Sequence, residues 1–214
     1  MSEAAVNASS CPGWFGKIPN VGDFVSRRLP DDFTHPWDEW LQSGMARARA
    51  DLGAAWLSRY LLAPVRRFWL APRLLGDTGW AGTLMPSVDG VGRHFPLTIA
   101  LALPDPTLAA VLAAGAWFGA IDAAGRKVLD VDFSADDLDA ELARVAPWPV
   151  GAPVDAEALQ LAATWLAPDH PRKMSLWWCG DAIQAAHFHC FGALPPPAAF
   201  GSLLREPEDD GCGP

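Results

Sequence analysis

Large and small side chains alternate along residues 94–103, where Phe95, Leu97 and Leu103 stand on one face and Thr98 and Ala100 on the other. A period of two residues predicts a β-strand. Because the second face is small and mostly apolar, we expect burial of both faces, with a helix close to the small one. Residues 65–71 and 80–88 predict two more strands. Glycine-containing links join these three stretches, which favours antiparallel neighbours.

Two hairpins are predicted near the ends of the chain. Residues 14–18 and 24–29 flank the segment 19–23, which is rich in turn-forming proline, asparagine, glycine and aspartate. Near the other end, residues 175–179 and 184–191 flank Gly180-Asp181, so we expect a closing hairpin with these two residues in its turn.

Helical periodicity begins near the first hairpin. Pro36 suits the first turn of a helix, and an apolar stripe follows through Trp37, Trp40 and Leu41. The stripe continues to Tyr60, which predicts one bent helix or two consecutive helices.

Further helices are predicted after the central strands. Residues 107–121 are apolar nearly all round, as expected for a helix buried between layers. A capping pattern at residues 134–137 and a cap at Asp155 predict the next two helices. Residues 195–204 predict a closing helix with proline in its first turn.

The predicted order of elements is β-β-α-β-β-β-α-α-α-β-β-α. This order favours an α/β fold, a mainly antiparallel mixed β-sheet with helices packed on both faces in a three-layer sandwich. The length of 214 residues fits one domain. We place that domain at 13–205, between a flexible N-terminal lead (1–12) and an acidic flexible tail (206–214).

Composition and charge narrow the functional classes. The net charge is -9, so the chain has no basic field for nucleic acid or anionic lipid. Residues 1–11 lack the basic start and apolar run of a secretory signal. The longest stretch without Asp, Glu, Lys or Arg, residues 182–204, contains three consecutive prolines, which argues against a membrane span. We expect a cytoplasmic protein whose cysteines are reduced.

Tryptophan dominates the aromatic composition, with 11 Trp against 1 Tyr. The tryptophans are spread along the whole chain, which favours core anchors in each element over a single aromatic ligand cage.

Four competent zinc ligands lie close together in the sequence: Cys179, His187, His189 and Cys190. With a turn at residues 180–181, His187 pairs near residues 174–176. That position lies roughly 10–16 Å along the strand from Cys179, whereas metal–ligand bonds measure about 2 Å. We therefore expect no metal site. The chain also lacks the glycine-rich nucleotide-binding signatures, and we expect no cofactor.

A second group of polar residues, Ser87, Asp89, Arg93 and His94, lies at the corner between two predicted strands. Ser, Asp and His are the residue types of a nucleophilic triad, which makes a hydrolase one alternative. Triad members normally come from separate segments, however. We favour a structural or partner-recognition role, in which Asp89 folds the turn and Arg93 pairs with a carboxylate.

A third group flanks the first predicted turn: Lys17, Asp23, Arg27 and Arg28. An ion pair from Asp23 to a nearby arginine, including Arg93, would fix the loop at a solvated edge and be worth about 0–1 kcal/mol. The alternative is a docking patch, because arginine is favoured at interfaces.

Loops held by a rigid sheet are where recognition residues concentrate. We therefore expect the two corners to lie close together and to border a partner-binding face containing Lys17, Asp23, Arg27, Arg28, Asp89, Arg93 and His94. On this hypothesis Lys17, Arg27 and Arg28 form a basic rim that orients an acidic partner.

Several sequence blocks stand out along the chain. They are GWFGKIP at 13–19, GDFV at 22–25, LMPSVDGVGRHFPLT at 84–98, the segment around Pro36 and Trp40, SLWW at 175–178 and LPPPAAF at 194–200. Together they resemble the TagF family of type VI secretion accessory proteins. The resemblance covers residues 13–205, and its specificity comes from the order of the blocks.

The resemblance implies an α/β sandwich and a non-enzymatic cytoplasmic regulator of type VI secretion. Such a protein would repress secretion after translation by binding the forkhead-associated scaffold protein of the apparatus. An assembly adaptor that promotes secretion is the alternative, and a hydrolase acting through Ser87, Asp89 and His94 is a more distant one. The family supplies no catalytic residues to transfer. Neither nucleic acid nor membrane insertion is expected, and a homo-oligomer is not indicated.

Overall fold

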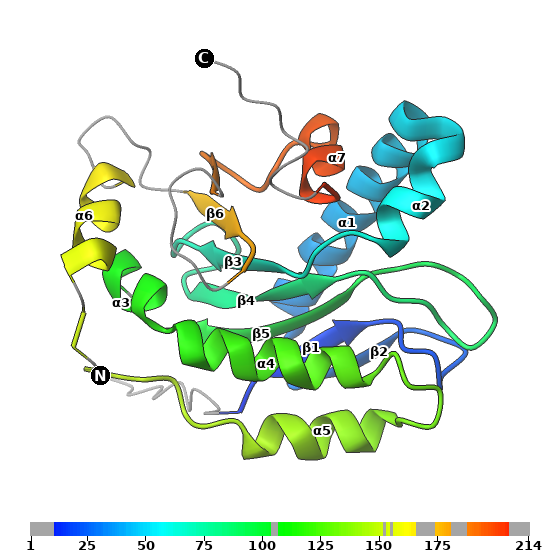
Figure 1. Ribbon diagram of the computed structural model, residues 1–214, viewed down its shortest axis with the longest axis horizontal. Coiled ribbons are helices and arrows are strands. Elements are labelled where there is room, and N and C mark those ends of the chain that lie inside the picture. The colour runs from blue at the N-terminus through cyan, green and yellow to red at the C-terminus, as the bar shows by residue number, and fades with distance from the viewer. Residues whose placement is uncertain are drawn as a thin grey trace.

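The computed structural model describes residues 11–103, 107–151, 153–154, 156–165, 174–180 and 188–205. A seven-stranded sheet runs through the centre in the order β2-β1-β5-β4-β3-β6-β7, and its strand pairs are antiparallel. Helices cover both faces of this sheet, so the chain folds as the three-layer α/β sandwich that the sequence predicts (Figure 1).

The predicted strands form the sheet as adjacent antiparallel pairs. The opening hairpin pairs β1 (Gly13–Gly16) with β2 (Val25–Arg27), and Trp14 lies opposite Arg27. The central strands are β3 (Arg66–Leu70), β4 (Gly79–Met85) and β5 (Leu97–Leu103). The closing pair is β6 (Ser175–Trp178) with β7 (His189–Phe191). The link between β4 and β5 adds an isolated bridge between Val88 and His94.

One face of the sheet packs against α1 (Asp31–Leu52), α2 (Trp56–Leu61), a 3-10 turn at Pro197–Ala199 and α7 (Phe200–Leu203). A 3-10 turn at Gly53–Ala55 joins α1 to α2. The small face of β5 lies on this side, as predicted, and the indole Nε1 of Trp37 donates to the Thr98 hydroxyl at 2.8 Å. The ring of Trp37 also lies 4.9 Å from that of Phe68 and 6.0 Å from that of Trp177.

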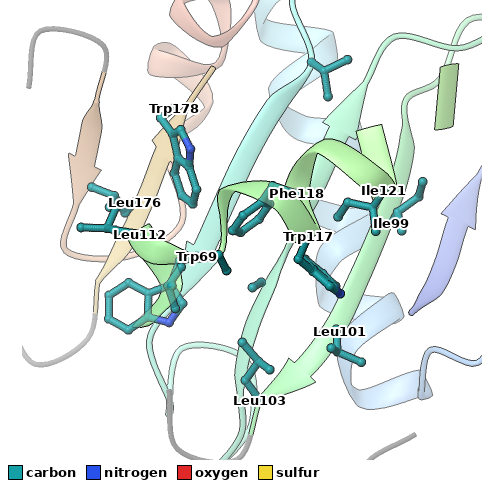
Figure 2. Packing of buried hydrophobic residues seen from close by; sticks show 14 of the residues in the cluster. Trp69, Ile99, Leu101, Leu103, Leu112, Trp117, Phe118, Ile121, Leu176 and Trp178 are labelled. Atoms are coloured by element: carbon teal, nitrogen blue, oxygen red, sulfur yellow. The ribbon is translucent and has the colours of Figure 1, made fainter. Parts of the chain in front are cut away.

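The opposite face packs against α3 (Leu108–Ala113), α4 (Gly115–Lys127), α5 (Ala135–Arg144) and α6 (Ala156–Trp165). Figure 2 shows the centre of this layer, where Trp117, Phe118 and Ile121 of α4 lie over the strands beside Ile99 and Leu101. The large face of β5 therefore supplies this core. Among the residues whose burial is described, nine tryptophans are buried in the two layers, in agreement with their predicted role as anchors.

The first helix begins earlier than the sequence analysis placed it. It starts at Asp31, after the extended residue Pro30, and Pro36 lies inside it. Two forces favour the extra turn. The carboxylates of Asp31 and Asp32 stabilise the positive end of the helix dipole, and Phe33 is fully buried against Trp37 and Trp80.

Two other expectations are corrected. The helix expected over 107–121 is divided at Ala114 into α3 and α4. The closing hairpin has Trp177 opposite His189, whereas a two-residue turn at residues 180–181 would place Trp177 opposite Gln184, so the expected register is wrong. His187 lies outside the described residues, as does the predicted cap Asp155.

Two arginines within the buried strand β3 face opposite layers, and each meets polar partners. Arg66 Nε donates to the carbonyl oxygen of Leu203 at 2.9 Å, at the carboxyl end of α7. Arg67 Nε and Nη2 contact Asp122 Oδ2 of α4 at 3.0 and 2.9 Å. Buried charges are tolerated when paired in this way, so these arginines join the sheet to both helical layers.

No helix in the described ranges is long and apolar enough to cross a membrane.

Candidate functional site

The two corners that the sequence analysis singled out lie against each other at one end of the sheet. The backbone N–H of Gly90 donates to the carbonyl oxygen of Val21 at 3.0 Å, and the Arg93 guanidinium donates to the carbonyl oxygen of Gly22. A side chain at position 90 would meet the carbonyl oxygen of Pro19, so glycine permits this close approach. The β1–β2 and β4–β5 links are therefore one interlocked unit.

Asp89 is the centre of this unit. Its Oδ2 accepts from Lys17 Nζ and from Arg93 Nε, both at 2.7 Å, and its Oδ1 accepts from the backbone N–H groups of Val91 and Arg93 at 3.1 and 2.8 Å. The Asp89 carboxylate is fully buried, and the Lys17 side chain is 6% exposed. An isolated charge at such a depth would be costly, and the pairing offsets that cost.

The surroundings of Asp89 also change its acidity. Burial by itself would raise the pKa of this carboxyl. The hydrogen bonds from Lys17, from the backbone and side chain of Arg93 and from the Val91 backbone outweigh burial, and they hold the pKa of Asp89 well below its usual range. Asp89 is therefore ionised at neutral pH and serves as the acceptor that closes the corner.

Ser87 and His94 take structural positions around the same corner. The Ser87 hydroxyl donates to the carbonyl oxygen of Lys17 at 2.6 Å, and the His94 ring packs edge-to-face on Trp56 and Tyr60. Within the described part of the chain, no hydrogen bond joins the side chains of Ser87, Asp89 and His94. The arrangement expected of a nucleophile, base and orienting acid is absent among these three residues.

Tyr60 is a member of this site that the sequence analysis did not identify. Its hydroxyl donates to the carbonyl oxygen of Ser87 at 2.8 Å and accepts from the Ser87 N–H at 2.9 Å. Burial is the main cause that raises the pKa of Tyr60 far above its usual value. The one sequence feature that could have drawn attention to Tyr60 is that it is the single tyrosine of the chain. Tyr60 fixes the β4–β5 link against α2.

The remaining charged candidates are arranged differently from the expectation. Asp23 is exposed and accepts from the backbone N–H of Phe24 at 2.8 Å, whereas Arg93 pairs with Asp89 instead of Asp23. Lys17 is buried and forms no part of an exposed rim.

The two arginines of the expected basic rim face α5. Arg28 Nη1 lies 2.8 Å from Asp139 Oδ1, and Arg27 lies 3.7 Å from Asp136 and 3.8 Å from Asp139. Their charges are thus partly compensated within the chain, which makes a contact from these arginines to an acidic partner less favourable than expected.

One of the four candidate zinc ligands, His187, lies outside the described residues, so the absence of a zinc site stays a prediction. Among the residues that the structure describes, no group of three or more His, Cys, Asp or Glu side chains could hold an ion. His189 lies opposite Trp177, which leaves it roughly 7 Å along the strand from Cys179. Burial raises the pKa of the Cys190 thiol, which disfavours the thiolate that a metal requires.

Comparisons with known proteins identify the family. The sequence model of the TagF N-terminal domain, described as type VI secretion system-associated, matches residues 13–145. Among solved structures, the fold is similar to the crystal structure of PA0076 from Pseudomonas aeruginosa PAO1, with a TM-score of 0.76 and 36% sequence identity. That match covers 90% of this chain and 93% of the other. A search of curated proteins gave no match. The chain therefore belongs to the TagF N-terminal domain family of type VI secretion-associated proteins.

Proposed function

We propose that this protein is a non-enzymatic cytoplasmic repressor that restrains type VI secretion after translation by binding the forkhead-associated scaffold protein of the apparatus. The family match over residues 13–145 carries the link to type VI secretion. Repression and the scaffold as partner extend that link, and both follow from the resemblance to TagF proteins.

The corner geometry supports binding over catalysis. Ser87, Asp89 and His94 each have a structural contact that accounts for the position of the side chain. These three side chains therefore act as a rigid structural support. Pre-organised loops of this kind favour recognition, because little conformational entropy is lost when a partner binds.

The joined corners are the proposed binding face. Asp23 and Arg93 are exposed on it, Lys17 and Asp89 support it from below, and His94 lies at its border. This assignment keeps the two loops that the sequence analysis selected.

Gene deletion with measurement of a secreted substrate tests the direction of the effect. Secretion rises for a repressor, whereas a fall would identify an assembly adaptor. Calorimetric titration with the purified scaffold protein tests the partner. A chain that does not bind the scaffold and whose loss leaves secretion unchanged would refute the proposal.

A substitution at His94 separates binding from catalysis. We expect His94→Gln to retain repression, since the imidazole carries no chemistry in this proposal. Loss of repression by a folded His94→Gln protein that still binds the scaffold would favour the hydrolase alternative.

A further inference from the structure

Exposed apolar side chains gather at the end of the molecule where the two corners meet. Four of the large ones come from three loops there: Phe24, Val91, Leu129 and Val131, with 43%, 69%, 54% and 67% of their surfaces exposed. We call these loops, residues 19–24, 86–96 and 128–134, the loop end. They lie together on the right side of Figure 1, and α6 lies at the opposite end. Clustered apolar exposure of this kind marks interaction surfaces.

The loop end is held in one arrangement by contacts between its loops. The first loop bonds to the second through Gly90 and Arg93, as described above, and to the third through Asn20 Nδ2, which donates to the carbonyl oxygen of Val131 at 3.1 Å. The Phe24 ring packs edge-to-face on buried Phe95, with 4.7 Å between the centroids. The apolar side chains are therefore presented on a preformed support.

The unpaired charges of the loop end are acidic. Asp23, Asp130 and Asp132 are exposed, and none of them has an ion-pair partner among the described residues. Arg93 is the single lysine or arginine within the three loops, and Asp89 already pairs with it. A partner with exposed lysine or arginine would complement these carboxylates, whereas an acidic partner would be repelled.

We propose that the loop end docks a protein partner whose contact surface has an apolar centre bordered by lysine or arginine. Burial of Val91, Val131 and the exposed part of Phe24 supplies the apolar contact. The three aspartates supply orientation and a salt-dependent association rate. This inference rests on the proposed function only in taking the scaffold protein as the first candidate for that partner.

In-cell photo-crosslinking tests the surface without assuming the partner. A photoreactive amino acid replaces Val91 in one strain and Leu159 of α6 in another. Leu159 is a matched control, because it is an apolar residue with 53% exposure at the opposite end of the molecule. We expect one protein to crosslink from position 91 and not from position 159. Mass spectrometry should place the crosslink in an apolar peptide with neighbouring lysine or arginine.

Two variants test the chemistry of the contact. Val131→Ser removes an apolar side chain without adding charge, and we expect it to lower the crosslink yield from position 91 at least about fivefold, as for a central contact. Asp130→Asn with Asp132→Asn should lower the yield, and in crosslinking repeated in cell lysate at several salt concentrations it should weaken the dependence of the yield on salt. Leu159→Ser is the control and should leave the yield unchanged. Circular dichroism establishes that each variant is folded.

The outcomes separate this inference from the proposed function. A crosslink to the scaffold supports both. A crosslink to another protein of the stated chemistry supports the loop end and refutes the scaffold as partner. A second copy of this chain, an acidic partner peptide, equal yields from both positions or no crosslink from position 91 would overturn the inference. If the purified scaffold nevertheless binds in that last case, the proposed function survives and its docking surface lies elsewhere.

Discussion

The Trp37→Ala substitution tests how the α1 layer is held to the sheet. Trp37 is fully buried, and its ring lies among the rings of Phe33, Phe68 and Trp177. Its indole N–H also donates to Thr98 of β5. Truncation therefore removes the apolar contact between helix and sheet, together with the hydrogen bond that fixes the helix over the small face of β5.

The expected loss follows from the burial. An indole buries roughly 150–250 Å², which at about 25 cal/mol per Å² corresponds to about 4–6 kcal/mol. Measured tryptophan truncations in cores cost about 3–5 kcal/mol. The Thr98 hydroxyl also loses its partner, which adds about 1 kcal/mol when water does not replace it. We expect Trp37→Ala to lower the free energy of unfolding by about 4–6 kcal/mol.

Urea denaturation followed by tryptophan fluorescence measures this loss, and thermal melts should show a decrease in Tm of about 8–24 °C. Trp148→Ala is the control, because that ring is half-buried at the margin of the other layer. Its loss should be less than half as large. If Trp37→Ala lowers the free energy of unfolding by less than about 1 kcal/mol, the packing argument is refuted, because truncation of a buried tryptophan costs about 3–5 kcal/mol.

Four other variants test the fold and the corner. A side chain at Gly44 would overlap the ring of Phe200, so we expect Gly44→Ala to cost about 1–3 kcal/mol; Gly119→Ala has open space and should gain up to about 1 kcal/mol in the same melts. The pKa of Asp89 is lowered by folding, so its ionisation stabilises the native state above about pH 4 and that contribution is lost as pH falls further. The free energy of unfolding of Asp89→Asn should therefore be lower than that of the parent at neutral pH and closer to it at about pH 2, as measured by urea titrations over a pH series. A difference that stays constant across pH would contradict this. Charge reversal at Arg27 and Arg28 together should lower stability by about 1 kcal/mol, because both contact carboxylates of α5, and should leave scaffold binding within about twofold, because neither belongs to the loop end.

The strands and most helices could be predicted because their signals are local. Large and small residues alternate along β5 because its two faces meet different neighbours, and this alternation is visible in the sequence. The Ser134–Asp137 capping box is formed by residues three positions apart. The start of α1 was missed for a tertiary reason. Pro36 carried a local signal for a first turn, but burial of Phe33 against Trp80 extended the helix in the N-terminal direction.

The register of the last hairpin shows the same limit. Sequence composition favours a turn at Gly180-Asp181, but it does not fix how many residues the link contains. The pairing of β6 with buried β3 sets the position of Trp177, and Phe68 and Trp37 pack against that side chain. Strand register is specified by which side chains must be buried. The register of this hairpin therefore depends on tertiary packing as well as on the composition of the turn.

The sequence by itself determined the α/β class, the order of elements and the resemblance to TagF proteins, because each depends on spacing or on short local blocks. Only the tertiary structure decided which charges pair. Lys17 and Asp89 lie 72 positions apart along the chain, and the β1–β5–β4 arrangement brings them together in a buried site. Arg27 and Arg28 likewise face α5, more than 100 positions along the chain. Charge pairing depends on distance and burial in three dimensions, and a pattern along one dimension contains neither.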